Sequence, residues 1–276
     1  MLLGLGARTH DLARRALVMG VVDLTPGPAA GRDGRQELES LCRRAGEMVA
    51  AGADLLDVGG LGSGADPGPS EPEELERVVP VISALAERFE VALSVGTRRA
   101  SVAAESFRAG AVVGNDASGF ADPGYLAAAA GAGATVVVAH GRLAPRPGAP
   151  GPDCGQVVEQ VRSSLAEGVE RARAAGVGAD RIVVDAGIDQ GKTTPCSLAL
   201  LAGCSRLADL GVPLLLSVSG NGFLAEALGL EPGQMRQASS AAHAVGLSLG
   251  ARVLRAFDVA AARRVRDTLA AVMAAE

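Results

Sequence analysis

The sequence predicts an α/β protein of one fold class, a single (β/α)8 TIM barrel that spans residues 1–276. Three observations predict it. The chain contains eight short apolar runs, helical segments separate them, and its length suits the roughly 250 residues that such a barrel uses. Most runs are continuously apolar and rich in valine and leucine, which is typical of parallel strands buried on both faces. An open doubly wound sheet is the main alternative.

The expected strands follow one another along the whole chain. They are Ala16–Leu24, Asp54–Val58, Val91–Val95, Ala111–Gly114, Ala134–His140, Arg181–Asp185, Val212–Val218 and Ala251–Arg255. Helices are expected at Gln36–Ala51, Glu71–Arg88, Arg98–Ala109, Asp153–Ala175 and Ala260–Ala274. The second helix follows Ser70 and carries Glu73 and Glu74 in its first turn, which suits both helix capping and the helix dipole.

Composition excludes several classes of partner. The net charge is −5, tryptophan is absent and tyrosine occurs once, so we expect no nucleic-acid binding. Apolar stretches fall short of about 18 residues and the start has no secretory signal, so we expect no membrane contact and a cytoplasmic protein. The four cysteines are scattered, which favours free structural thiols over a disulfide or a zinc site. They are Cys42, Cys154, Cys196 and Cys204.

The apolar runs end in residues of which several are polar. These residues are Asp23, Asp57 to Gly60, Gly96, Asn115 with Asp116, His140, Asp185, Ser219 and Arg255. Each has an ordinary structural explanation, such as an aspartate that caps a loop. In a (β/α)8 barrel, however, the carboxyl ends of all strands meet at one face, where the chemistry takes place. The barrel therefore predicts that these side chains converge on a small-molecule site.

Lys192 is the one lysine among 26 basic residues, and it lies near the end of the segment DRIVVDAGIDQGKTT (Asp180–Thr194). Lysine is a compact point charge whereas arginine is a planar fork, so a lone lysine beside Asp185 indicates a position where shape matters. A phosphate loop is excluded, because its two glycines need four residues between them and this segment has three. The long loops Thr25–Arg35 and Gly141–Pro152 fit either lids or ordinary surface loops.

Six ordered segments at the expected strand ends carry recognisable signatures. They are VMGVVDLTPG (Val18–Gly27), AGADLLDVGG (Ala51–Gly60), LSVGTRRASVAAESFRAGAVVGNDASG (Leu93–Gly119), DRIVVDAGIDQGKT (Asp180–Thr193), LLLSVSGNGFL (Leu214–Leu224) and LRAFDV (Leu254–Val259). Together, over nearly the whole chain, they resemble the dihydropteroate synthase family. Its motifs at these places include SVDT, IND-SG, DPGxGFGKT, SRKSF and RVHDV.

This resemblance implies an activity and a set of site residues. Family members join 6-hydroxymethyl-7,8-dihydropterin pyrophosphate to p-aminobenzoate with help from Mg²⁺, and they usually form homodimers through their late helices. By resemblance, the substrate-binding residues are Asn115, Asp185, Lys192, Ser219 and Arg255, with Asp185 and Lys192 assigned to catalysis. Asp23 stands at the metal-associated asparagine and can serve Mg²⁺ as a hard oxygen ligand.

The departures from the family pattern lie in the chemistry. Gly96 replaces the aspartate of SVDT, Ser63 and Gly64 replace a threonine and an arginine, Gly220 and Asn221 replace the two cations of SRKS, and Phe257 replaces the histidine of RVHDV. Arginine-rich composition does not explain these losses. Two lost hydrogen bonds to charged groups weaken anion binding by roughly 10²- to 10⁴-fold. Arg98, Arg142 or Arg146 could compensate from nearby loops.

Three functions therefore remain open from the sequence. The favoured one is an enzyme whose site has been rebuilt for a different substrate, either pterin-like or from specialised metabolism. The others are a weak but true dihydropteroate synthase, and an inactive relative that acts as a binding or interaction protein.

Overall fold

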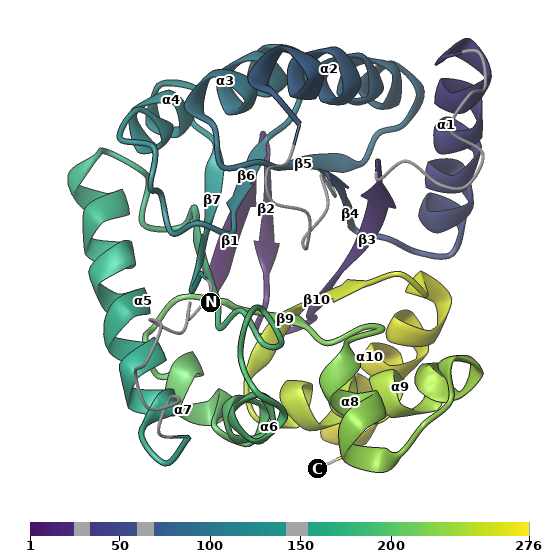
Figure 1. Cartoon of the computed structure of the whole chain (residues 1–276), viewed down its shortest axis with the longest axis vertical. Coiled ribbons are helices and arrows are strands. Elements are labelled where there is room, and N and C mark those ends of the chain that lie inside the picture. The colour runs from purple at the N-terminus through teal and green to yellow at the C-terminus, as the bar shows by residue number, and fades with distance from the viewer. Residues whose placement is uncertain (25–33, 60–68, 142–153, 276) are drawn as a thin grey trace.

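The computed structural model contains a closed barrel of eight parallel strands in the order β10-β3-β4-β5-β6-β7-β8-β9 (Figure 1). The structure describes residues 1–24, 34–59, 69–141 and 154–275. The barrel strands are β3 (Leu17–Asp23), β4 (Leu55–Gly59), β5 (Ala92–Gly96), β6 (Val113–Asp116), β7 (Thr135–Ala139), β8 (Ile182–Asp185), β9 (Leu214–Ser217) and β10 (Ala251–Ala256). Each overlaps one expected strand. The predicted (β/α)8 fold is confirmed, and the open sheet is excluded.

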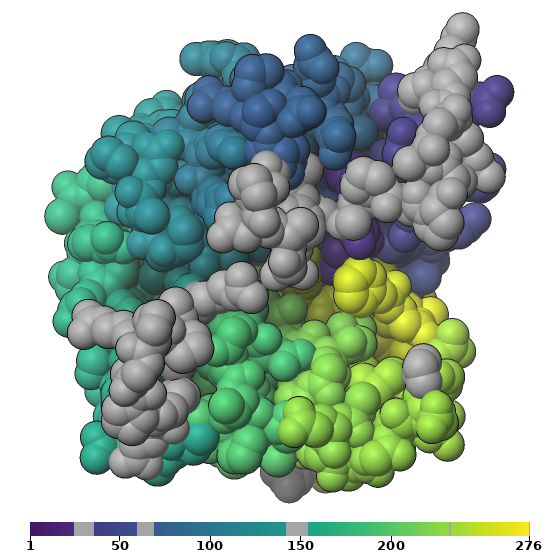
Figure 2. Space-filling view, viewed as in Figure 1, coloured from purple at the N-terminus to yellow at the C-terminus, as the bar shows by residue number. Residues whose placement is uncertain are grey.

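Helices surround the barrel and follow the strands in turn (Figure 1). They are α1 (Gly34–Ala50), α2 (Glu71–Arg88), α3 (Ala100–Arg108), α4 (Tyr125–Gly131), α5 (Val157–Ala174), α6 (Thr194–Ala202), α7 (Cys204–Ala208), α8 (Gly222–Leu228), α9 (Met235–Ser248) and α10 (Val259–Met273), with a 3-10 turn at Pro232–Gln234. The space-filling view shows that chain segments from the amino-terminal half and the carboxyl-terminal half pack together around one face of the molecule (Figure 2). No helix among the described residues is both long and apolar enough to cross a membrane.

A short hairpin closes the amino-terminal end of the barrel. Its strands are β1 (Leu2–Leu5) and β2 (Arg8–Asp11), which pair antiparallel. Leu3, Leu5 and Leu12 are buried against residues near the starts of the barrel strands. This hairpin is not among the elements that the sequence predicts, because β2 is polar and carries no apolar alternation. With one end closed, the opposite, carboxyl-terminal end is left for a ligand.

The start of α2 has the cap that the sequence predicts. The backbone N–H of Ser70 donates to Glu73 Oε2 at 2.8 Å, and the Ser70 hydroxyl donates to the same oxygen at 2.8 Å. Glu74 serves more than the helix dipole. Its carboxylate is 2% exposed, accepts a hydrogen bond from Thr97 at 2.5 Å and pairs with Arg99. This buried pair ties α2 to the loop that follows β5.

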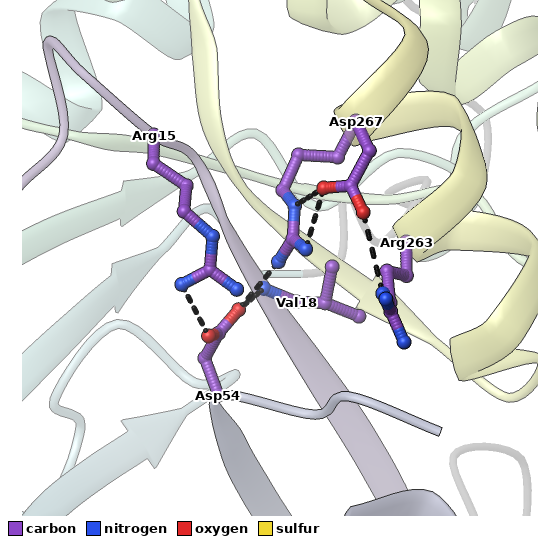
Figure 3. A network of polar contacts seen from close by, with 6 residues as sticks. Arg15, Val18, Asp54, Arg263 and Asp267 are labelled. Atoms are coloured by element: carbon purple, nitrogen blue, oxygen red, sulfur yellow. Dashed lines mark hydrogen bonds and ion pairs between the residues drawn. The ribbon is translucent and has the colours of Figure 1, made fainter. Parts of the chain in front are cut away.

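Asp54 organises a charged network at the amino-terminal end of the barrel (Figure 3). Its Oδ2 accepts from the backbone N–H of Val18 at 2.8 Å and from Arg266 Nη1 at 2.9 Å. Its Oδ1 pairs with Arg15 Nη1 at 2.8 Å. Arg266 is 4% exposed and also binds Asp267. The network joins the segment before β3, the start of β4 and the last helix, so it holds the two ends of the chain together.

We expect Asp54→Asn to lower the free energy of unfolding by about 2–3 kcal/mol, because it removes one charge of a buried pair and leaves Arg266 with Asp267 alone. Urea unfolding followed by circular dichroism measures the change. Glu170→Gln is the control, since it breaks an exposed pair with Arg173 and should change stability by less than about 0.5 kcal/mol. Equal effects of the two substitutions would show that the Asp54 network contributes nothing special.

Candidate functional site

A buried carboxylate, Asp57, lies at the centre of the candidate site. It belongs to β4, is fully buried, and accepts hydrogen bonds from three other strands. Ser94 Oγ donates at 2.6 Å from β5, Asn115 Nδ2 donates at 3.1 Å from β6, and Arg255 Nε donates at 2.8 Å from β10. The convergence that the sequence predicts for Asn115 and Arg255 is present. The sequence identifies Asp57 only as the end of a strand, whereas its contacts make it the group that joins the others.

Asp185 and Lys192 lie at the two ends of one tightly bonded loop after β8. Asp185 is 5% exposed, and its Oδ1 accepts from the backbone N–H of Gly187 at 2.8 Å. Lys192 is 7% exposed, and its Nζ donates to the carbonyl oxygens of Gly187 at 2.7 Å and His140 at 3.4 Å. The lone lysine therefore joins the loops after β7 and β8. A compact ammonium suits this position between two carbonyls, as its place in the sequence suggested.

Burial shifts the protonation of this group of side chains. Desolvation raises the pKa of Asp185, against the opposing effects of its Gly187 hydrogen bond and the charges of Arg255 and Lys192. Desolvation also lowers the pKa of Lys192 to about 8, although Asp185 acts in the other direction. The pKa of His140 falls to about 4 through burial and the nearby Lys192 charge, so its imidazole is neutral at neutral pH. Perturbed groups gathered at a barrel mouth are typical of a functional site.

The loop after β9 has a different character, since it contains no cation. Ser219 Oγ accepts from the backbone N–H of Phe257 at 3.3 Å, which places Ser219 at the rim beside the end of β10. Asn221 Nδ2 donates to the carbonyls of Ser217 at 3.0 Å and Ile188 at 3.4 Å. Gly220 has a φ of +73°, a conformation that side chains rarely adopt. The positions of the family's two cations thus hold a left-handed glycine and a loop brace.

Two glycines lie against each other where β4 and β5 end. A Cβ added to Gly59 would come within 2.9 Å of the Gly96 carbonyl oxygen, so that position requires glycine. A Cβ added to Gly96 would lie 3.6 Å from Gly59 Cα and 3.8 Å from Asp57 Oδ2, which are ordinary contacts. The backbone therefore has room for a Cβ at position 96, where the family motif carries an aspartate beside the place of Asp57.

Asp23 ends β3 in register with Gly59 and is half-buried. Among the described residues no group of three or more His, Cys, Asp or Glu side chains could hold a metal ion. A single carboxylate still fits Mg²⁺ when the substrate supplies phosphate oxygens, because this ion keeps several waters and takes few protein ligands.

Several predicted loop features lie outside the described residues. They are Gly60, Ser63, Gly64, Arg142, Arg146 and most of the loops Thr25–Arg35 and Gly141–Pro152. Arg98 is described and exposed. A cavity of about 520 Å³ adjoins the rim on its outer side, where Ser219, Gly220 and Phe257 meet α1, α9 and α10.

The prediction of four free thiols is wrong for one pair. Cys154 and Cys196 form a disulfide, with Cα atoms 4.7 Å apart and 42 residues between them in sequence. Their distance in sequence concealed the pairing, since the barrel brings the loops after β7 and β8 side by side. Cys42 and Cys204 are free and buried, as expected.

A (β/α)8 barrel with buried polar groups at its carboxyl-terminal mouth defines a class of small-molecule-binding proteins. The chain matches a family model described as "Pterin binding enzyme" over residues 19–256. It is 32% identical to dihydropteroate synthase of Escherichia coli K12 over 261 residues, covering 92% of each chain. It is 36% identical to "Inactive dihydropteroate synthase 2" of Mycobacterium leprae over 266 residues, covering 94% of this chain and 91% of that one.

A solved structure shows the same similarity. Dihydropteroate synthase from Stenotrophomonas maltophilia, with imidazole bound in its active site, superposes with a TM-score of 0.87 at 35% identity. The alignment covers 100% of this chain and 99% of that one. The chain therefore belongs to the dihydropteroate synthase family of pterin-binding enzymes.

We expect the buried lysine to impose a pH dependence on stability. The pKa of Lys192 is about 8 in the folded chain and about 10.5 when exposed, so the unfolded chain binds more protons between these values. Stability should therefore rise with pH from about 8 to about 10.5 in the parent, relative to Lys192→Met. Urea unfolding of both proteins at about pH 7.5 and about pH 10 tests this. A parallel pH response of the two proteins would contradict it.

Proposed function

We propose that the barrel binds a pterin-type bicyclic heterocycle without a pyrophosphate group and acts on a substrate other than that of the ordinary condensation. The single observation that carries this proposal is the division of the mouth into two halves. Asp57, Asn115, Asp185 and Arg255 form a connected polar half, whereas Gly220, Asn221 and the exposed Phe257 supply no cation at the positions where the family motifs have them. The arginines of the adjoining cavity, Arg44 and Arg236, come from α1 and α9, and Arg236 is paired with Asp258.

The polar half suits the edge of a flat heterocycle. A carboxylate such as Asp185 accepts two N–H groups, and a fixed amide such as Asn115 offers its oxygen once its nitrogen is bound to Asp57. Arg255 uses its Nε for Asp57, so its terminal nitrogens and planar face remain for a ligand. Lys192 supports this half by holding the Asp185 loop and by adding a positive charge near that carboxylate. In this proposal Asp185 and Lys192 remain the groups closest to catalysis.

The other half suits an apolar or neutral substituent. Phe257 is 50% exposed at the end of β10 and offers a ring where the family motif has a histidine. The Asn221 amide is committed to two carbonyls and carries no charge. A leaving pyrophosphate needs cations or a metal to stabilise its charge. For a substrate that still carried phosphate, Asp23 would hold Mg²⁺, which would neutralise that charge when bound.

The relatives support a departure from the condensation. The Mycobacterium leprae relative, and a second one from Mycobacterium bovis at 35% identity, are both named inactive dihydropteroate synthase 2. Those names concern those proteins, but they show that members this similar to the chain include ones without the ordinary activity. An inactive binding protein is therefore the second candidate for this chain, and a weak true synthase the third.

We also propose a cytoplasmic homodimer. Leu198, Leu228 and Val245 are exposed apolar residues on α6, α8 and α9, three neighbouring late helices. Burying them against a second copy would remove apolar surface from water.

Calorimetric titration with 6-hydroxymethyl-7,8-dihydropterin and with its pyrophosphate, each with and without Mg²⁺, tests the proposed ligand class. We expect both compounds to bind within about threefold of each other, because the anion half adds little. Asp185→Asn should weaken binding by roughly 10- to 100-fold through loss of a charged hydrogen bond. The exposed Asp209→Asn is the matched control. A Mg²⁺-dependent preference of more than about 100-fold for the pyrophosphate would favour a true synthase, and no binding of either compound would reject the proposal.

The double variant Gly96→Asp with Asn221→Lys tests whether the lost groups account for lost condensation. Position 96 accepts a Cβ at ordinary contact distances, and the lysine restores a cation at the rim. We expect dihydropteroate formation to rise by roughly 10²-fold or more over the parent, as two charged contacts would allow. Gly131→Asp, on an exposed helix position with open space around it, is the control. High activity in the parent chain would contradict the proposal.

A further inference from the structure

We propose that Cys154 and Cys196 are a site of thiol–disulfide exchange that controls the Asp185–Lys192 loop, with a small dithiol or a dithiol protein as the reactant. Its link to ligand binding rests on the proposed function. The disulfide joins two neighbouring loops at the mouth of the barrel: Cys154 precedes α5, and Cys196 lies in the first turn of α6, four residues after Lys192.

A hydrogen bond links the helical turn that holds the disulfide to the loop of the site. Ser197, next to Cys196, accepts from the backbone N–H of Asp189 at 3.2 Å. Asp189 has a φ of +66°, which is unusual for a residue other than glycine, so its conformation depends on the contacts around it. Asp189 lies between Asp185 and Lys192 in the same loop. The first turn of α6, which the disulfide fixes, therefore supports the loop that carries both groups.

The two sulfurs differ in the way that exchange requires. Cys154 is half-buried, whereas Cys196 is fully buried. An incoming thiolate can therefore reach Cys154 first. The electron pair of the broken bond then goes to Cys196, which lies in the first turn of α6, where the helix dipole favours negative charge while burial opposes it.

The reaction balances with one dithiol. Its first thiolate attacks Cys154 Sγ, forming a mixed disulfide and releasing the Cys196 thiolate. Its second thiolate then attacks the mixed disulfide and releases the Cys154 thiolate. Two electrons and two protons pass to the protein, which ends with two thiols, while the dithiol becomes a disulfide. In the cytoplasm proposed above, disulfides are usually transient and redox-sensing rather than structural.

Hydrogen exchange on the full chain, before and after treatment with dithiothreitol, tests this proposal without any ligand. We expect amides of residues 186–197 to exchange about tenfold faster after reduction, because the first turn of α6 is released. Residues 259–273 should not change. In the Cys154→Ser variant the amides of residues 186–197 should exchange rapidly both before and after dithiothreitol. The Cys42→Ser variant, which loses a thiol outside the disulfide, should behave as the parent does.

Calorimetric titration with 6-hydroxymethyl-7,8-dihydropterin then measures the link to the site. We expect reduction to raise the dissociation constant of the parent by about fivefold or more, and to leave that of Cys154→Ser unchanged. The disulfide-exchange site would be overturned if the hydrogen-exchange rates did not change on reduction, or if the air-oxidised protein contained four free thiols. If hydrogen exchange became faster on reduction but neither the oxidised nor the reduced protein bound 6-hydroxymethyl-7,8-dihydropterin, the disulfide-exchange site would be supported and the proposed ligand rejected. If hydrogen exchange became faster on reduction but the pterin bound equally well in both states, the proposal that the disulfide controls ligand binding would be rejected.

Discussion

The site depends on one interaction, the buried contact of Asp57 with Arg255. A fully buried carboxylate costs several kcal/mol unless opposite charge and hydrogen bonds compensate it. Arg255 supplies the charge, and Ser94 and Asn115 supply the remaining donors. Because a carboxylate only accepts, it also fixes the Asn115 amide with its nitrogen inward and its oxygen free. Because the buried Asp57 carboxylate needs hydrogen-bond donors, it orients the polar groups of three other strands in the absence of a ligand.

The same principle operates in the adjacent loop with the signs reversed. Lys192 is buried at a cost that lowers its pKa to about 8, and two carbonyl oxygens and the charge of Asp185 compensate in part. The main role of a lysine in this position is to bind backbone carbonyls, and its charge near Asp185 is a smaller contribution. Arg255 and Lys192, the two cations of the polar half, thus each bind a protein acceptor, Arg255 through its Nε and Lys192 through its Nζ. These contacts hold the polar half in place, whereas Gly220, Asn221 and Phe257 add no cation to the rim.

The sequence predicts whatever is determined locally. Continuous apolar runs indicate buried strands, and the topology of a barrel then brings their polar ends together, so Asn115, Asp185 and Arg255 could be identified before the structure. The sequence does not reveal which distant residues pair with each other. Asp57 meets Asn115 across 58 positions and Arg255 across 198, and nothing local distinguishes it from a loop cap. Cys154 and Cys196 were missed for the same reason, and the β1–β2 hairpin was missed because β2 is polar.

The geometry of Asn221 argues against simple decay of the site. Replacing a whole buried ion pair with apolar residues of similar size is often neutral or stabilising, so stability alone does not require such a pair, although removal of a single partner is costly. Yet the buried set of Asp57, Asp185 and Lys192 is present and bonded. Where the family's cation is absent, Asn221 joins the loop after β9 to Ile188 in the loop after β8. Asn221 thus braces the Asp185 loop from a second side, which is the arrangement that the proposed binding pocket requires.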